Sequence, residues 1–525
     1  MATNNGISVF EYKKKQYLER IDLIAKESFN NEQKIVAKQI IESANENNID
    51  AIYQLVTQRV KTGFVFDAAP EVNHNCVALV TENEVLNIYS SEAIQNEHSL
   101  IIGENYEGLK NLLCTYINPS TGEGVVDVIY IDPPYNTESA KKDGNDYKDE
   151  VEATKFVYRD KFTRDGWLNM MNERITLARK ILSSQGIIYI SINENEHAYL
   201  KVLCDSIFGE VNYVSSFIWK SKLGKVGTTS LISTTHENIL CYAKDIKKVT
   251  IDQILKVNNG RKENLRQWGQ ADKRSDRESM YFPISIDGID IYPIKDDGTE
   301  GRWRVGVETA KELLEGGKLI IESKKGKSEI YRIFDSGYST SSYDSMLSGL
   351  GTTADGTKTL KSLKLNGKFD YPKPVNLIKH LIKIYSNKEA IFLDFFAGSG
   401  TSGQAVMELN AEDGGNRKFI LVTNNENNIA IDVTRERLYR VINGKGSNNE
   451  QIDWKYSDTT KSLLNNSVRV FEIEYHELEL NDFEKAKKLI PIAEEQFKKL
   501  NPNYKAKGRF DIYNDLASLN PYKKV

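Results

Sequence analysis

The sequence predicts an α/β fold in which a mainly parallel sheet carries helices on both faces. Short apolar segments rich in β-branched residues, such as 100–102, 125–131 and 187–190, alternate with longer segments whose apolar residues recur every three or four positions. Repeated alternation of this kind is typical of doubly wound sheets. The alternation lapses between residues 245 and 360, so we expect an inserted domain there.

Length and composition describe an ordinary globular chain. The 525 residues are 40% hydrophobic and 27% charged, which excludes wholesale disorder and leaves room for several domains. No run approaches about 18 apolar residues, and the first residues lack the pattern of a cleaved leader, so we expect neither a membrane span nor secretion. Four single cysteines, without a C-x-x-C pair or nearby histidines at ligand spacing, predict no metal site and a reducing cytoplasmic location.

Charge is distributed unevenly along the chain. The net charge is −4, from 70 Lys and Arg against 74 Asp and Glu, yet residues 215–375 hold 27 basic against 21 acidic residues. A basic middle on an acidic background is compatible with a nucleic-acid surface and equally with an ordinary solvated surface. Charge alone therefore leaves the partner open.

The N-terminal region, residues 1–65, is predicted to be helical. Apolar residues lie among charges with few helix breakers, which favours one or two amphipathic helices. We expect this region to serve dimer or partner contact. The apolar positions are Leu18, Ile21, Ile24, Ile35 and Ile41.

Residues 66–244 are predicted to form the first half of the α/β domain. A strand at 100–102, a helix around Leu109 and a strand at 125–131 come first. Two prolines then forbid both a helix and a central strand, so a loop begins at Asp132.

This half continues with further helix and strand pairs. The helix at 168–182 is followed by Gly186, which we interpret as its C-terminal cap, and by a strand at 187–190. Asn193 and Glu196 resemble the capping box of the next helix. Further strands are expected at 217–219 and 239–242.

The second half of the domain is expected at residues 361–445. A helical stripe around Ile378 precedes strands at 391–393 and 419–422. The α/β domain is therefore split around the insert.

The C-terminal region, residues 446–525, holds one more strand and one more helix. The strand is predicted at 468–475, and a charged helix is predicted at 483–500. Pro491 is expected to kink or cap that helix.

A glycine-rich turn follows the predicted strand at 391–393. The segment LDFFAGSGT at 393–401 reads as a strand end, a turn and the start of a helix, a place where a nucleotide-like ligand can approach the backbone. A tight turn without a ligand would look similar, and the third glycine of the dinucleotide fingerprint is absent. The Gly-Lys-Ser at 326–328 lacks the leading glycine of a phosphate loop, so we do not expect a nucleoside triphosphatase.

Asp132, Pro133, Pro134 and Tyr135 combine a carboxylate, a stiffened backbone and an aromatic ring at a strand end. An exocyclic amino group on a base is a poor nucleophile, because its lone pair is delocalised into the ring. If Asp132 and the Pro133 carbonyl accept its two protons in hydrogen bonds, the lone pair can turn toward an electrophile. The Tyr135 ring can stack on a base drawn out of its helix. The alternative is a proline-stiffened turn in which Asp132 acts as a cap.

Together, IDPPYNT at 131–137 and FLDFFAGSGT at 392–401 resemble the two hallmark motifs of the amino-methylating, S-adenosylmethionine-dependent DNA methyltransferases. The catalytic motif precedes the cofactor motif, which resembles the β arrangement of that family. The resemblance covers roughly residues 100–245 and 355–445. Further segments are similar to the modification subunits of type III restriction systems: WLNMMNERITLARKILSSQGIIYISINENE, FIWKSK, HENILCYAK, KPVNLIKHLI and RKFILVTNNEN.

The resemblance implies a Rossmann-like, doubly wound class I methyltransferase fold with an inserted α+β target-recognition domain at residues 245–360. It implies S-adenosyl-L-methionine as the cofactor. It assigns Asp132, Pro133, Pro134 and Tyr135 to catalysis and base holding. The residues that would line the cofactor are Asp394, Phe396, Ala397, Gly398, Gly400 and Thr401, with Lys373 and Pro374 closing over its methionine part.

The residue that holds the cofactor's ribose is less clearly marked. The family usually places an acidic residue just after the second strand, but here the strand leads into Asn424, Asn425 and Glu426. We favour Glu426, although each of the three can accept a hydrogen bond from a hydroxyl. An Asp at position 132 resembles the adenine-modifying members, whereas cytosine 4-amino enzymes more often carry Ser there.

The insert contains a basic cluster with DNA-binding potential. Arginine and glutamine side chains can contact bases, and lysine side chains can contact phosphates. A salt-bridged surface helix is an equally open interpretation, because acidic residues are interspersed. Trp303 fits either a core position or a base contact, and the polar loop at 138–165 either orders on DNA or is an ordinary surface loop. The cluster is Arg261, Lys262, Arg266, Arg274 and Arg277.

The sequence therefore predicts a bacterial, cytoplasmic, site-specific adenine DNA methyltransferase that acts on the 6-amino group. We expect double-stranded DNA, a second copy of the chain and a restriction subunit with helicase or nuclease activity as partners. The alternatives are a cytosine 4-amino or RNA-directed methyltransferase, an orphan or type II methylase, and a non-catalytic DNA-specificity subunit.

Overall fold

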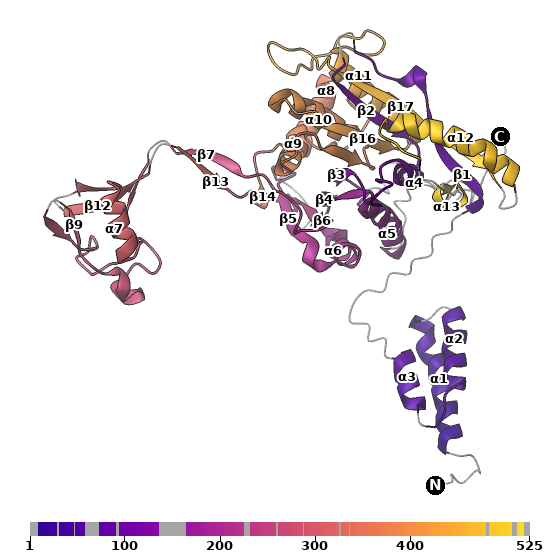
Figure 1. Cartoon of the computed structure of the whole chain (residues 1–525), viewed down its shortest axis with the longest axis horizontal. Helices are drawn as coiled ribbons and strands as arrows, with labels where there is room; N and C mark the ends of the chain where they lie inside the picture. The colour runs from indigo at the N-terminus through magenta and orange to yellow at the C-terminus, as the bar shows by residue number, and fades with distance from the viewer. Residues whose placement is uncertain are drawn as a thin grey trace. The chain divides into compact units, whose positions relative to one another are not determined.

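The structure is a computed structural model, and the chain divides into two units that are described separately: residues 1–69 with 163–169, and residues 70–162 with 170–525 (Figure 1). The residues that the structure describes are 9–28, 31–46, 48–57, 73–90, 94–135, 164–224, 232–258, 261–286, 288–324, 327–334, 337–478, 482–506 and 512–518.

The described residues between 9 and 57 of the N-terminal unit form the helices α1 (Val9–Ser28), α2 (Asn31–Glu42) and α3 (Ile49–Thr57), where the sequence predicted one or two. Its core is formed by Ile21, Ala37 and Ile41. Two of the expected apolar positions, Ile21 and Ile41, are thus buried, whereas Ile35 is 56% exposed. The role of this unit in dimer or partner contact stays a prediction.

The second unit is built on one mixed sheet in the order β14-β5-β6-β4-β3-β15-β16-β2-β17-β1-β18. The six strands from β4 to β17 in that order run parallel to one another. Strand β6 runs antiparallel to both β4 and β5. The predicted α/β class with a mainly parallel sheet is confirmed. The strand bounds are β1 (Asn73–Glu82), β2 (Asn96–Ile102), β3 (Val126–Ile131), β4 (Leu182–Ile192), β5 (Tyr213–Trp219), β6 (Glu237–Ala243), β14 (Met346–Leu347), β15 (Ile391–Asp394), β16 (Lys418–Thr423), β17 (Asn466–Glu477) and β18 (Ala517–Ser518).

Helices cover both faces of this sheet. A Cβ atom at Gly108 of α4 would lie 2.8 Å from Val422 Cγ1, and one at Gly403 of α10 would lie 3.1 Å from Leu421 Cδ1. Because successive side chains of a strand point to opposite faces, α4 and α10 pack on opposite sides of β16. The helices are α4 (Asn105–Thr115), α5 (Arg164–Ile181), α6 (Glu194–Phe208), α8 (Thr353–Ser362), α9 (Val375–Ile384), α10 (Thr401–Asp413), α11 (Glu436–Asn443), α12 (Phe483–Leu500) and α13 (Ile512–Asp515).

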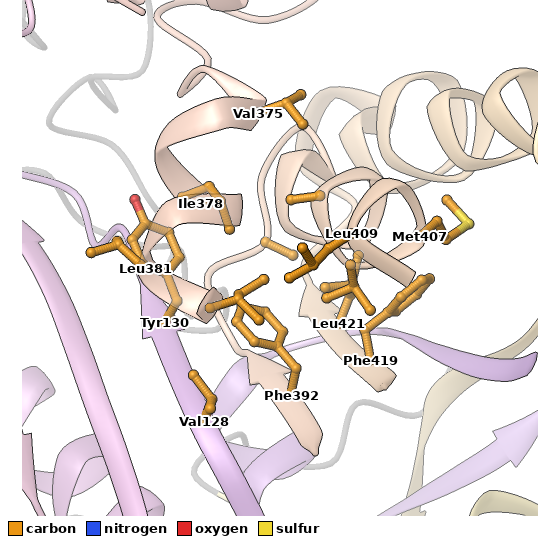
Figure 2. Close-up of a cluster of buried hydrophobic side chains, with 14 of the residues drawn as sticks. Val128, Tyr130, Val375, Ile378, Leu381, Phe392, Met407, Leu409, Phe419 and Leu421 are labelled. Atoms are coloured by element: carbon orange, nitrogen blue, oxygen red, sulfur yellow. The ribbon is translucent and has the colours of Figure 1, made fainter. Parts of the chain in front are cut away.

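The core between this sheet and helices α9 and α10 fixes the start of α9. Figure 2 shows Ile378 and Leu381 of α9 facing Tyr130 of β3, and Leu409 of α10 beside Leu421 of β16. All five side chains are at most 2% exposed, and burying each one stabilises the fold by about 1.5–3 kcal/mol. The segment that precedes α9 is thereby held against the sheet.

The insert has a hydrophobic core of its own. Its elements are β7 (Ile254–Asn258), β8 (Lys262–Asn264), β9 (Ile284–Ile286), β10 (Ile289–Ile291), α7 (Val307–Glu315), β11 (Leu319–Lys324), β12 (Lys327–Ile333) and β13 (Gly337–Ser341). Trp303 is 1% exposed in this core, and its Nε1 donates a hydrogen bond to the Phe282 carbonyl at 2.8 Å. Trp303 is therefore a core residue and not a base contact.

Two predicted domain boundaries were wrong. The predicted insert at 245–360 is too long, because β14 extends the main sheet and Leu360 of α8 is buried in the main core. Gly, Ser and Thr surround these apolar residues, so the composition of the segment resembles that of the insert. The C-terminal region is likewise no separate body, since β17 lies between β2 and β1 in the sheet.

Two local interpretations also change. Gly186 is not a helix cap: α5 ends at Ile181, and Gly186 lies within β4 at a register irregularity. A Cβ atom there would lie 3.0 Å from the Val126 carbonyl oxygen, so the close approach of two backbones explains the glycine. Pro491 does not end its helix, since α12 runs through it. Asn193 caps α6 as expected, accepting a hydrogen bond from the Asn195 N–H.

Among the described helices, none has the length and apolar character needed to span a bilayer. The same residues contain no cluster of three or more His, Cys, Asp or Glu side chains arranged to hold a metal ion.

Candidate active site

The two hallmark segments meet at one edge of the sheet. Strands β3 and β15 are parallel neighbours, with Val128 opposite Phe392 and Ile129 opposite Leu393. Asp132 and Asp394 follow these pairs within three residues, so both acids lie at the carboxyl ends of adjacent strands. Sites in open α/β sheets are expected at such an edge.

Three polar side chains converge around Asp132. Lys373 Nζ lies 2.8 Å from Asp132 Oδ2, 3.1 Å from Glu237 Oε2 and 2.8 Å from the Tyr135 hydroxyl. The Tyr135 hydroxyl lies 2.7 Å from Asp132 Oδ1 and 3.0 Å from Glu237 Oε2. We call Asp132, Tyr135, Glu237 and Lys373 the sheet-edge tetrad.

The four members of the tetrad come from three parts of the chain. Asp132 and Tyr135 belong to the loop after β3, and Glu237 is the first residue of β6. Lys373 immediately precedes Pro374, which is the N-cap of α9. Three separate parts of the chain therefore meet in a space of a few ångströms.

Burial and the neighbouring charges shift the pKa values of Asp132, Glu237 and Lys373 in opposite directions. Burial disfavours the ammonium of Lys373, but the carboxylates of Asp132 and Glu237 outweigh that effect and raise its pKa. Burial raises the pKa of Asp132 despite the neighbouring ammonium. Burial acts in the same direction on Glu237, but Lys373 outweighs it, and the pKa of Glu237 is lowered.

The structure gives Lys373 two contacts that were not expected. The family resemblance placed Lys373 with the cofactor, but its ammonium contacts Asp132 and Glu237. Glu237 was not predicted at all. Its signals are its place in the segment HENILCYAK and its position as an acidic residue that opens a strand whose remaining residues are buried.

The glycine-rich turn is organised by Asp394, which is 2% exposed. Its carboxylate accepts hydrogen bonds from the Phe396 N–H at 3.0 Å and the Ser402 hydroxyl at 2.5 Å. Burial raises the pKa of Asp394 to about 7. Gly398 and Gly400 have φ angles of 47° and 74°, a left-handed conformation that glycine adopts readily.

The side chain of Arg437 supports the same turn through hydrogen bonds. This buried guanidinium donates hydrogen bonds to the Ser399 carbonyl at 3.2 Å, the Thr401 hydroxyl at 2.7 Å and Gln404 Oε1 at 2.8 Å. Burial lowers the pKa of Arg437 to about 9. Thr401 opens α10 as predicted, but its buried hydroxyl contacts Arg437, so it supports the turn.

The remaining expected cofactor residues lie within this turn or at the start of α9. Ala397 is buried, Phe396 is half-buried, and Pro374 is buried at the start of α9. A Cβ atom at Gly398 would lie 2.9 Å from Phe369 Cζ, so the segment before α9 reaches the glycine turn. This contact was not predicted, although Phe369 lies four residues before Lys373 in the sequence.

Glu426 has the properties of a ligand-binding acceptor. It lies after β16, the parallel neighbour of β15, and is half-buried, and burial raises its pKa. Within the described part of the chain, its carboxylate makes no hydrogen bond or ion pair, whereas Asn425 Oδ1 accepts the Ile431 N–H at 3.4 Å. A partner-free carboxylate at this edge fits the hydroxyls of a ribose, and favours Glu426 over Asn425.

Asn105 and Arg174 form a further polar group that supports the turn. Asn105 Nδ2 donates to the Phe395 carbonyl at 2.9 Å, and Arg174 Nε donates to Asn105 Oδ1 at 2.5 Å. Arg174 is fully buried and also pairs with Glu104 at 2.5 Å. The sequence analysis missed this group; its signal is the polar pair Glu104 and Asn105 directly after strand β2.

The basic cluster of the insert is largely paired with acids. Arg266, expected to bind DNA, is 3% exposed and lies 3.1 Å from Asp296 and 4.0 Å from the Trp268 ring centroid. That prediction is wrong for Arg266, because its guanidinium is buried inside the insert. The segment is also no helix, since it comprises β8, loops and two short 3-10 turns.

The other four predicted DNA contacts are exposed. Lys262 forms an ion pair with Glu322, and Arg274 forms one with Glu300 at 3.0 Å. Arg261 lies over the Phe334 ring at 4.9 Å. Arg277 is exposed between two 3-10 turns. The predicted DNA-ordering loop at 138–165 falls almost wholly outside the described residues.

Comparison with known families identifies the α/β unit. A family model described as a DNA methylase matches residues 126–443. A second model, for an uncharacterised conserved protein family, matches residues 14–119.

Several curated proteins are similar over much of the chain. The Mod subunit of the type III restriction-modification enzyme StyLTI from Salmonella typhimurium is 32% identical, over 83% of this chain and 69% of that protein. The EcoPI Mod subunit of Escherichia phage P1 is 30% identical, over 66% of this chain and 60% of that protein. The type II methyltransferase M.KpnI of Klebsiella pneumoniae is 31% identical, over 62% of this chain and 80% of that protein.

Among solved structures, the cytosine-N4-specific PvuII DNA methyltransferase is similar with a TM-score of 0.33 and 12% identity. That match covers 66% of this chain and 89% of that chain.

Proposed function

Because this chain belongs to the DNA methylase family, we propose that it is the modification subunit of a restriction-modification system and methylates the 6-amino group of adenine in a specific DNA sequence. The observation that carries this proposal is the convergence of Asp132, the Pro133 backbone and Tyr135 beside the glycine-rich turn at one sheet edge.

The chemistry follows from what this edge can accept. Asp132 and the Pro133 carbonyl accept the two N–H groups of the target amine, which turns the nitrogen lone pair out of the base ring. The Tyr135 ring offers a stacking surface for a base rotated out of the duplex. The methyl group would be released from the sulfonium by cleavage of its C–S bond, leaving a neutral thioether, and Asp132 would take the surplus proton of the methylated amine and pass it to solvent.

The cofactor is S-adenosyl-L-methionine, which supplies a methyl group activated by its sulfonium. The turn at 394–401 and the free carboxylate of Glu426 fit such a group, because they offer close backbone approach and a hydroxyl acceptor at neighbouring strand ends. Asp394, Phe396, Ala397, Gly398 and Gly400 are proposed to line it, with Pro374 closing one side.

The preference for adenine rests on the aspartate at position 132. A carboxylate can also accept from the 4-amino group of cytosine, so the cytosine enzyme is the second candidate. Mass analysis of nucleosides from the methylated DNA separates the two products.

Partners are proposed from the relatives and the charge of the insert. Several relatives are Mod subunits of type III restriction-modification enzymes, which supports a restriction subunit as partner. The three N-terminal helices are proposed to mediate homodimer or partner contact. Arg261, Lys262, Arg274 and Arg277 are proposed to contact DNA.

The decisive experiment compares cells that express this chain with cells that express Asp132→Ala. Single-molecule sequencing of their DNA scores modified bases by sequence context. We expect one motif carrying modified adenine only when Asp132 is present. Equal modification with Asp132→Ala contradicts the catalytic assignment. If purified protein with labelled cofactor transfers no methyl group to duplex DNA, the chain is a non-catalytic subunit or acts on another substrate such as RNA.

A further inference from the structure

All three hydrogen-bond contacts of the Lys373 ammonium are made with the other members of the tetrad. Its three ammonium donors meet acceptors on Asp132, Tyr135 and Glu237 within 3.1 Å, and its side chain is only 8% exposed. The ammonium also lies 5.0 Å from the Tyr135 ring centroid and 5.8 Å from that of Trp219. A buried lysine with every donor engaged at the sheet edge has no donor left for a cofactor.

We infer that Lys373 and Glu237 form a positioning pair that holds the Asp132 carboxylate ionised and oriented to accept the amino group of the target base. Neither residue is inferred to touch the base or the cofactor. This inference rests on the proposed function, because it assigns roles in that same reaction.

The need for Lys373 follows from the two carboxylates. Asp132 and Glu237 both lie within 3.0 Å of the single Tyr135 hydroxyl, which has only one proton to donate. Without a cation, two acids so close favour sharing a proton. A protonated Asp132 presents an O–H donor and is a weaker acceptor than the carboxylate, so it binds the amine N–H less well. Lys373 removes this competition by neutralising one of the two charges.

Glu237 completes the geometry from the other side. It accepts from Lys373 at 3.1 Å, so the ammonium is held between two carboxylates and is not drawn wholly onto Asp132. Asp132 keeps acceptor strength because it shares the cation. Each of its oxygens also retains a second lone pair after the contacts with Tyr135 and Lys373, which leaves room for the incoming amine.

Two further titratable groups lie near Asp132, and neither of them supplies positive charge. The Tyr130 hydroxyl from β3 and the Asp394 carboxylate from β15 lie close enough to interact with Asp132 electrostatically. Both are buried, and the Tyr130 hydroxyl forms a hydrogen bond with Ser191 Oγ at 2.9 Å. Among the described groups facing Asp132, Lys373 is the one that supplies positive charge.

The first test replaces the ammonium while keeping the stem, in Lys373→Met. At saturating cofactor and DNA we expect kcat to fall roughly 100-fold, the size typical for loss of one preorganised polar group at an active site. The cofactor Kd should stay within about twofold. The acid limb of the kcat–pH profile should move to higher pH by about one unit, because Asp132 loses its cation.

A matched control is Lys379→Met. Lys379 lies on α9 after Lys373, is 13% exposed and pairs with Glu408 at 3.0 Å and Glu412 at 2.6 Å. It is thus also a half-buried, doubly paired lysine, but it contacts no member of the tetrad. We expect unchanged kcat, cofactor Kd and acid limb in this variant.

The second test removes a negative charge beside Asp132, where the first removed the positive one. In Glu237→Gln, Asp132 alone faces Lys373, so the acid limb should move to lower pH. Lys373→Arg keeps the charge and should return the limb to its wild-type position, although the planar fork cannot reach all three acceptors and kcat stays reduced. These two variants carry the test if Lys373→Met fails to fold, as judged by thermal unfolding.

The outcomes separate this inference from the proposed function. If wild-type protein transfers no methyl group, the proposed function fails. If wild type is active and Lys373→Met weakens the cofactor Kd with normal kcat, Lys373 is a cofactor residue and the inference is overturned. A loss of kcat with unmoved acid limbs in both Lys373→Met and Glu237→Gln shows a merely structural role and overturns it as well.

Discussion

At the carboxyl edge of the sheet, charged side chains are buried and several of them share one partner, whereas on the surface of the insert Lys262 and Arg274 each pair with a single exposed acid. Arg174 is fully buried and Lys373 is 8% exposed, but Lys262 and Arg274 are about half exposed beside equally open acids. Removing one partner from a buried group leaves an uncompensated charge, whereas an exposed pair exchanges its partner for water. The same residue types therefore serve different ends in the two regions.

The largest expected effect comes from breaking a buried group at the edge. Arg174→Met leaves Glu104 and the bracing Asn105 without their cation, and we expect a loss of about 3–5 kcal/mol in the free energy of unfolding. The exposed counterpart, Lys262→Met, should cost about 0–1 kcal/mol. Denaturant unfolding of both variants checks this prediction. Equal losses would break the contrast between the regions.

A second prediction concerns the buried carboxyl at the cofactor turn. Asp394 has a pKa of about 7 in the folded protein against roughly 3.9 unfolded, so its protonated form stabilises the fold. That contribution is fully present below about pH 4 and is lost as pH rises to about 7. A cationic cofactor favours the ionised form, so binding must release the proton below pH 7.

We expect cofactor affinity to fall up to about tenfold per pH unit below 7 in wild type. Asp394→Asn should bind more weakly overall but show a flat profile in that range. Calorimetric titration in buffers of different ionisation enthalpy measures the released proton directly. A flat wild-type profile would mean that Asp394 does not face the bound cofactor.

The smallest effect is expected at the surface of the insert. Arg277→Ala and Arg261→Ala should each reduce the slope of log affinity for DNA against log salt by about one, if each contacts one phosphate. Lys311→Ala, on α7 beside Glu308, is the exposed control and should leave the slope unchanged. Titration of duplex DNA at several salt concentrations decides it. Unchanged slopes for both arginines would place the DNA surface elsewhere.

Sequence reasoning worked where the signal is local. Asp132 through Tyr135 and Asp394 through Thr401 are continuous segments, so their residue types and order could be interpreted together, and both lie at the predicted edge. Glu237 and Arg174 could not be found in this way, because they join the site only through packing of distant strands and helices. Arg266 was misassigned because its acidic partners, Asp296 and Glu329, lie 30 and 63 residues away.

The same limit explains the errors in domain boundaries. The segment around Leu347 and Leu360 is polar on average, and its membership in the main core depends on a few apolar side chains. Strand β17 was predicted as a strand, but its place between β2 and β1 is a long-range pairing that local periodicity does not encode.

The position of β17 has a consequence for the order in which the protein is made. Strand β2 pairs on one side with β16 and on the other with β17, both more than three hundred residues later in the chain. A newly synthesised β2 therefore waits with both edges open until β16 has been made, and with one edge open until the ribosome has passed residue 477. Such distant pairing slows folding and exposes strand edges to aggregation. The cofactor edge can thus be completed only late in synthesis, after the insert and most of the helices have already emerged.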